Sequence, residues 1–91
     1  MYKISEYTKK QAKKLNVKVK PSKVANKKID VFKDGKLIAS VGDKRYNDYP
    51  TYIKTRGKVY ADDRRKLYKI RHEKHRHKKG TASYYADKLL W

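Results

Sequence analysis

Cysteine is absent from this 91-residue chain. Without it the chain has no disulfide framework, no thiolate metal site and no cysteine nucleophile. Apolar runs are only about three or four residues long, so we expect no membrane span and no signal-peptide core. These absences are typical of a protein made in a reducing, intracellular compartment.

Large aliphatic residues are also scarce: isoleucine, leucine, valine and phenylalanine make up less than a fifth of the chain. Together with a net charge of +18, this content resembles that of disordered chains. Nine tyrosines and one tryptophan supply apolar area that the aliphatic count misses, so we expect one small ordered domain with little core. The charge predicts a polyanionic partner: nucleic acid, an anionic membrane surface or an acidic protein surface.

The positive charge is concentrated in two blocks. Residues 1–27 hold nine lysines against one acidic residue, and residues 61–80 hold nine lysines or arginines against three acidic residues. We divide the single domain into a basic helix and arm (1–27), a β-hairpin (28–42) and a tyrosine-rich helical part (43–91).

The first block predicts a short helix and then an extended arm. Thr8 and Gln11 have the spacing of a capping box, and Asn16 is a suitable left-handed stop. Val17 and Val19 alternate with lysines before a proline, which suits a strand or an extended arm.

The clearest local pattern is an Asp-Gly pair at 34–35 between two apolar runs. It predicts a hairpin with a type I′ turn, in which both central residues take positive φ. This turn pairs Phe32 with Leu37 and Val31 with Ile38. Because a lone hairpin is marginal in water, we expect the valine-lysine segment of the arm as a third strand.

The C-terminal half predicts two or three helices. Pro50 suits the first turn of a short helix that Gly57 ends. Residues 61–78 predict a longer helix ended by Gly80, and Ser83 is the expected cap of a last short helix.

The long helix has a narrow apolar stripe of Leu67 and Ile70, with Tyr60 and Tyr68 beside it. We therefore expect this helix to pack against the rest of the domain through a narrow contact and to expose most of its circumference to a charged partner. The fold class that these elements predict is α+β: a β-hairpin or three-stranded antiparallel sheet, a short N-terminal helix, and two or three C-terminal helices.

The second basic block is the main candidate binding surface. Arginine grips phosphate or carboxylate bidentately and lysine acts as a mobile charge, so a helical strip of both suits a phosphate backbone. The alternative to phosphate binding is that this basic strip is only a solvated face of the helix or forms a salt-bridge network between subunits. Asparagine and glutamine are scarce there, so contact with DNA is expected to be electrostatic. The predicted polyanion-binding residues, with four from the first block, are Arg64, Arg65, Lys69, Arg71, His72, Lys74, His75, Arg76, Lys78, Lys79, Lys9, Lys10, Lys13 and Lys14.

Tyrosines and the apolar C-terminus form a second candidate set. Residues 81–91 carry one base and one acid beside several large apolar residues, so we expect the segment to be buried, in its own core or in a partner. Tyr49, Tyr52 and Ile53 share a helical face that either builds the core or forms an interface patch. The predicted protein-docking residues are Tyr46, Tyr49, Tyr52, Tyr84, Tyr85, Leu89 and Trp91.

Metal binding and catalysis find little support. His72 and His75 share a helical face, but His77 points elsewhere and no further ligand stands at the right spacing. The first pair also misses the i, i+4 spacing of zinc proteases, so we expect the histidines to extend the cationic strip instead. The four glycines stand apart, without a phosphate-binding loop. We expect no enzymatic activity, metal, cofactor or small-molecule substrate; a small nuclease using tyrosine, arginine and histidine is the enzymatic alternative.

Three strings carry a family resemblance. They are residues 48–53 (Asp-Tyr-Pro-Thr-Tyr-Ile), the basic run at 61–76, and residues 84–91 (Tyr-Tyr-Ala-Asp-Lys-Leu-Leu-Trp). These strings resemble a family of small basic proteins of nucleocytoplasmic large DNA viruses, whose function is uncharacterised. The resemblance implies synthesis in the cytoplasm or nucleus of an infected cell and a place in the virion. It carries over no functional residues.

Two functions from different classes follow. The first is a minor structural component of a large virus particle, docked on larger capsid proteins or acidic protein surfaces through tyrosine and leucine faces. The second is a sequence-independent protein that binds double-stranded DNA and packages or tethers the genome. The excess of tyrosine over phenylalanine, nine to one, favours the first because tyrosine suits half-wet contacts. A membrane-surface role ranks third, since no predicted helix has the broad apolar face it requires.

Overall fold

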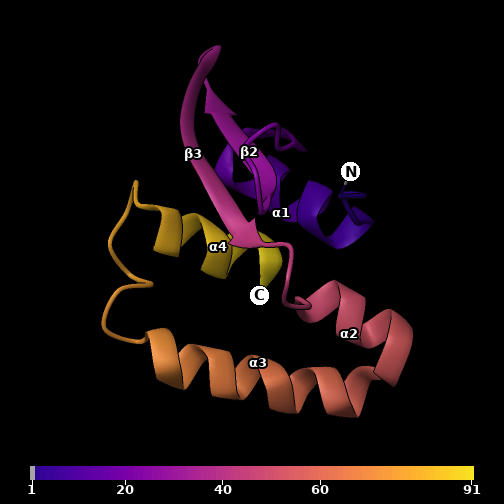
Figure 1. Cartoon of the computed structure of the whole chain (residues 1–91). Coiled ribbons are helices and arrows are strands. Elements are labelled where there is room, and N and C mark those ends of the chain that lie inside the picture. Colours follow the sequence, from indigo (N-terminus) through magenta and orange to yellow (C-terminus); the bar gives the residue numbers. More distant parts are fainter. Residues whose placement is uncertain (1) are drawn as a thin grey trace.

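A computed structural model describes residues 2–91 and confirms the predicted α+β class. The strands form one antiparallel sheet in the order β1-β2-β3. Figure 1 shows α4 crossing near the base of the sheet, between the sheet and α3. The elements are α1 (Glu6–Leu15), β1 (Lys18–Pro21), β2 (Lys27–Lys33), β3 (Lys36–Asp43), α2 (Tyr49–Arg56), α3 (Lys58–His72) and α4 (Ala82–Leu90).

The capping box predicted for the first helix is wrong. Ser5 is the N-cap of α1, and its hydroxyl oxygen accepts a hydrogen bond from the Thr8 amide at 3.2 Å. Thr8 and Gln11 instead donate their side-chain hydrogens to backbone carbonyls of α4, so a tertiary contact takes both groups. The predicted stop is confirmed, because Asn16 ends the helix with φ of 57°.

The hairpin forms as predicted at its turn and departs from the prediction one pair later. Both residues of the 34–35 turn have positive φ, 52° and 78°, and Phe32 pairs with Leu37. A bulge between Val31 and Phe32 then shifts the register, so Val31 pairs with Ala39, one residue further than predicted. The extra residue in β3 places a small side chain opposite the fully buried Val31.

The core lies between the sheet, α1 and α4. Ile29, Val31 and Val41 are fully buried and cluster with Leu89 and Leu90. The valine-lysine segment is the third strand, since β1 pairs antiparallel with β2. Of the two alternatives left open for the C-terminal segment, the structure shows burial in the chain's own core.

α4 begins one residue after Thr81, whose hydroxyl oxygen accepts a hydrogen bond from the Tyr84 amide at 3.2 Å. The N-cap is therefore Thr81 and not the predicted Ser83. Further along α4, the side chain of Asp87 lies on the inner side of the helix and is fully buried.

α2 and α3 form a helical pair on the far side of α4 from the sheet (Figure 1). Pro50 stands in the first turn of α2 and Gly57 ends it, as predicted. The prediction of a helix reaching residue 78 is wrong: α3 ends at His72, and residues 73–80 form turns. In these turns the Arg76 guanidinium lies 3.5 Å from the carboxylate of the buried Asp87.

The predicted apolar stripe of α3 does not face the core. Leu67 and Ile70 are 47% and 65% exposed, whereas Ala61 and Tyr68 are the buried residues of this helix. The inner face therefore depends on small and aromatic side chains, and the aliphatic ones face outward.

Candidate functional site

Most of the positive charge is not neutralised within the chain. Among residues 2–91, eight of the 27 lysines and arginines lie within 4.0 Å of a carboxylate oxygen, which leaves 19 without an ion pair. Several of these unpaired lysines and arginines line two hollows in the surface. The residues that line the two hollows differ in chemical type.

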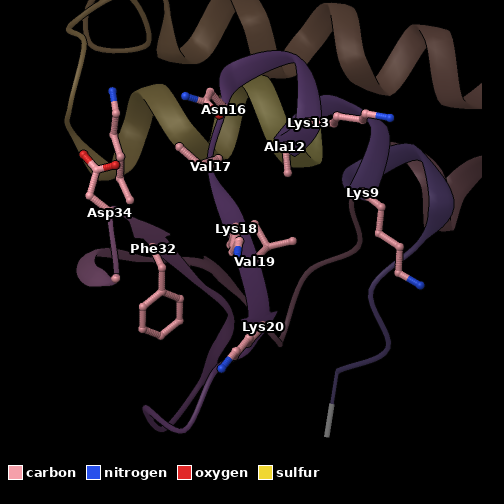
Figure 2. A pocket seen from close by; sticks show the side chains of 12 residues that line it. Lys9, Ala12, Lys13, Asn16, Val17, Lys18, Val19, Lys20, Phe32 and Asp34 are labelled. Atoms are coloured by element: carbon pink, nitrogen blue, oxygen red, sulfur yellow. The ribbon is translucent and has the colours of Figure 1, made fainter.

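The first hollow, about 900 Å³, lies between α1, β1 and the hairpin turn (Figure 2). Val17, Val19 and Phe32 supply its apolar lining, and Asp34 is the single acidic residue among the residues that line it. Lys20 extends over the ring of Phe32, with Nζ 5.5 Å from the ring centroid. We name this hollow the lysine groove after Lys9, Lys13, Lys18, Lys20 and Lys33.

The groove follows from the position of β1 at the sheet edge. Along an edge strand successive side chains alternate between faces, so the valines turn toward the core and Lys18 and Lys20 are exposed on the other face. Lysines on an edge strand also discourage pairing with another chain. The predicted set contained Lys9 and Lys13 but missed Lys18, Lys20 and Lys33, although the alternation in the sequence already placed the first two on one face.

The second hollow, about 510 Å³, lies between α4, the base of the sheet and the α2–α3 pair. One part of its wall is aromatic: Tyr68 and Trp91 stack with centroids 4.4 Å apart at 9°, and His72 stacks on Tyr68 at 4.2 Å. Tyr52 is tilted against Trp91 at 6.1 Å. We name this hollow the aromatic cleft after Tyr46, Tyr52, Tyr68, Trp91, Arg64, Arg71 and His72.

The aromatic cleft is positively charged. Arg64 and Arg71 make no ion pair in the described chain, and Arg64 lies over Tyr52 with its guanidinium carbon 5.7 Å from the ring centroid. Asp43 is the single acidic lining residue, and hydrogen bonds from Arg45 neutralise it and lower the pKa of Asp43 to about 2.

Two ring groups of the cleft have shifted pKa values. Burial raises the pKa of the Tyr68 hydroxyl to about 12, and the charge of Asp87 adds to this shift. Burial lowers the pKa of His72, and the neighbouring charges of Arg71 and His75 lower it further. At neutral pH both rings are therefore uncharged, and the arginines supply the charge of the cleft.

Three of the predicted polyanion-binding residues take structural roles. Lys69 and Arg76 both pair with Asp87, because a fully buried carboxylate requires nearby positive charge. Arg65 lies flat against Tyr49, 3.9 Å from the ring centroid, and 3.7 Å from the carboxylate of Asp62.

The other predicted cations do not form one continuous helical strip, because α3 ends at His72. Arg64, Arg71 and His72 line the aromatic cleft, and Lys9 and Lys13 line the lysine groove. Six of the predicted basic residues are exposed outside both hollows: Lys10 and Lys14 on α1, and Lys74, His75, Lys78 and Lys79 in the turns after α3.

The predicted docking residues also divide by position. Tyr49, Tyr85 and Leu89 are buried in the interior and present no surface to a partner. Tyr84 is half-buried beside the core. Tyr46, Tyr52 and Trp91 line the aromatic cleft together with Tyr68, which the sequence placed only beside the apolar stripe of the long helix.

No family model, curated protein or solved structure matches the chain. Within residues 2–91 no three His, Asp or Glu side chains cluster closely enough to hold a metal ion. None of the helices in this range is both long and apolar enough to cross a membrane.

Proposed function

We propose that the protein binds double-stranded nucleic acid through its phosphates, without reading the base sequence. The lysine groove is the observation that supports this proposal best. Lys13, Lys18, Lys20 and Lys33 line one hollow, and none of them makes an ion pair within residues 2–91. Mobile ammonium groups suit phosphates, which carry charge but no sequence information.

This proposal assigns no catalytic residue and no cofactor. In the setting that the family resemblance implies, the binding packages or tethers the double-stranded genome of a large DNA virus in the virion. Non-specific binding of this kind is driven by the release of counterions from the nucleic acid, which makes it strongly dependent on salt.

A salt titration tests the proposal directly. If six to ten cations contact phosphates, log affinity for a random-sequence duplex should fall with log salt at a slope of about −5 to −9. Fluorescence anisotropy of a labelled duplex measures this slope. No binding at low salt, or a flat response, would exclude the proposal.

A pair of double variants tests the role of the groove. Lys18→Gln with Lys20→Gln should reduce the slope by about 2, since each lost phosphate contact reduces it by about 1. Lys44→Gln with Lys54→Gln is the matched control, because both lysines are exposed and lie outside the two hollows. Equal effects of the two pairs would show that the charge acts diffusely and that the groove has no special role.

The outer face of α3 favours a second candidate function, that of a minor structural component of the particle. Val59, Leu67 and Ile70 are 80%, 47% and 65% exposed on this helix. At a net charge of +18 a second copy of the chain is repelled, so the fitting occupant is a larger protein with an apolar patch rimmed by acidic residues.

Particle assembly tests the second candidate. Leu67→Ser with Ile70→Ser should leave the melting temperature nearly unchanged and lower the amount of the protein recovered with the capsid shell. Val24→Ser is the control, since Val24 is 46% exposed but lies in the β1–β2 loop. Recovery with the genome alone, unaffected by the α3 variants, would exclude docking through this face.

A further inference from the structure

The aromatic cleft exists because α3 is held away from α4 by long side chains. The two helices have few close backbone contacts, and the ion pair of Lys69 with Asp87 and the stack of Tyr68 on Trp91 span the distance between them. The hollow that results, about 510 Å³, lies within the range of small-molecule sites, about 300–1,000 Å³.

Arg64 lines this cleft and carries a hydrogen-bond donor that the described chain leaves unused. Its Nε is buried and has no hydrogen-bond partner in the described chain. Buried donors of native proteins are nearly always paired, most strongly when the partner is an anion. Arg71 lies seven residues later, about two helical turns along the same side of α3, and lines the same wall. Together the two arginines provide an anion-binding wall.

Aromatic rings also line the cleft, and its one acidic lining residue, Asp43, is paired with Arg45. Tyr46 is 68% exposed at the cleft, and Tyr52 and Trp91 are half-buried beside it. A groove that combines cations with aromatic faces is typical of proteins that bind single-stranded nucleic acid, because every base has a face that stacks. A duplex keeps its bases stacked on one another and has none to offer such a wall.

We infer that the aromatic cleft binds one nucleotide unit of a single-stranded nucleic acid, with the phosphate on Arg64 and Arg71 and the base against the exposed ring of Tyr46. This inference rests on the proposed nucleic-acid binding and adds a second site with a preference for single strands. The lysine groove binds duplex phosphates, and the cleft binds an unpaired base together with its phosphate.

Trp91 is the only tryptophan of the chain and stands in the cleft wall, so its fluorescence reports occupancy. The probes are a ten-nucleotide oligothymidylate and a random duplex of ten base pairs at one salt concentration, with anisotropy measuring binding of each. The oligothymidylate should quench Trp91, and the duplex should bind with little quenching. Inorganic phosphate and hexaglutamate, at equal concentrations of charge, should leave the fluorescence unchanged.

Two double variants that remove the same charge separate the sites. Arg64→Gln with Arg71→Gln should weaken oligothymidylate binding about 10-fold and change duplex binding by less than about 3-fold. Lys18→Gln with Lys20→Gln should show the opposite pattern. Tyr46→Ala should weaken oligothymidylate binding about 10-fold, and Tyr46→Phe should retain it, because the ring face and not the hydroxyl carries the stacking.

Several outcomes would overturn the inference. Equal quenching by the duplex would mean no preference for single strands, and equal quenching by hexaglutamate would mean a site for acidic peptides. Quenching by phosphate alone would mean an anion site without a base. If the oligothymidylate binds and quenches while the duplex fails to bind at low salt, the proposed duplex binding fails and the cleft stands.

Discussion

Thr8 on α1 donates its hydroxyl hydrogen to the backbone carbonyl oxygen of Leu89 on α4, at 2.8 Å, across 81 residues of sequence. Both residues are fully buried. The last four carbonyls of a helix have no partner within that helix, so a side chain from elsewhere must satisfy any that are buried. Together with the hydrogen bond from Gln11 to the Lys88 carbonyl, it holds α1 against α4.

Thr8→Val should therefore destabilise the domain by about 1–3 kcal/mol, because it keeps the shape of the side chain but leaves the Leu89 carbonyl buried without a donor. Urea unfolding followed by circular dichroism measures the difference. Thr55→Val is the matched control: Thr55 also donates to a backbone carbonyl, that of Thr51, but it is exposed. If both variants lose the same free energy of unfolding, the buried hydrogen bond of Thr8 contributes no more to stability than the exposed one of Thr55.

Two glycines with similar backbone angles should respond differently to alanine. Gly35 and Gly42 have φ of 78° and 82°, so alanine at either position costs about 1–2 kcal/mol of backbone strain. At Gly35 nothing lies within 4 Å of an added Cβ, whereas at Gly42 the Cδ1 atom of the buried Leu90 lies at 2.7 Å. Gly42→Ala should thus cost about 1–3 kcal/mol more than Gly35→Ala in the free energy of unfolding. Equal melting temperatures would contradict the packing of α4 against β3.

Asp48 should give the domain a measurable sensitivity to acid. Its carboxylate is buried and accepts hydrogen bonds from Tyr2 at 2.6 Å, from Lys28 at 2.9 Å and from the Thr51 hydroxyl at 2.6 Å. Burial alone would raise the pKa of Asp48, but the charge of Lys28 and these hydrogen bonds together lower it below the ordinary value of 3.8. Its stabilising contribution is therefore fully present above about pH 4 and is lost as the pH falls through the lower, folded-state pKa.

Asp48→Asn removes this contribution at every pH. At pH 7 we expect a loss of about 3–5 kcal/mol, because Lys28 remains buried and charged without a counterion. As the pH falls below about 4, the free energy of unfolding of the variant should decrease less than that of the parent chain. Asp63→Asn serves as the control, since Asp63 is exposed and without an ion pair in the described chain. Identical acid sensitivity of the parent chain and Asp48→Asn would refute this assignment.

Removal of the C-terminal segment should unfold the protein. A chain that ends at Gly80 lacks Leu89 and Leu90, which fill the core beneath the sheet, and circular dichroism should show loss of the folded signal. Leu89→Ala is the milder test, with an expected loss of about 2–5 kcal/mol. Leu67→Ala, at an exposed position, should change stability by less than about 0.5 kcal/mol. A truncated chain with native circular dichroism would show that the segment is not core.

The sequence by itself determined the features that depend on a few neighbouring residues. The turn at 34–35 and the helix stop at Asn16 were predictable because these residues tolerate positive φ wherever they stand. The third strand and the burial of the C-terminus were indicated by alternation and by the change from charged to apolar composition. The location of the two basic blocks is likewise a property of the sequence alone.

Only the tertiary structure decided which partner a side chain binds when it could form either a local or a long-range interaction. Thr8 caps no helix because a buried carbonyl of α4 takes its hydroxyl, and α3 ends early where Arg76 turns to the buried Asp87. The aromatic cleft depends on the same kind of choice, since Arg64 and Trp91 line one hollow only when α3 and α4 pack in the same domain. Local preferences are worth tenths of a kcal/mol to about one, and an unsatisfied buried polar or charged group costs more, so long-range satisfaction of those groups wins.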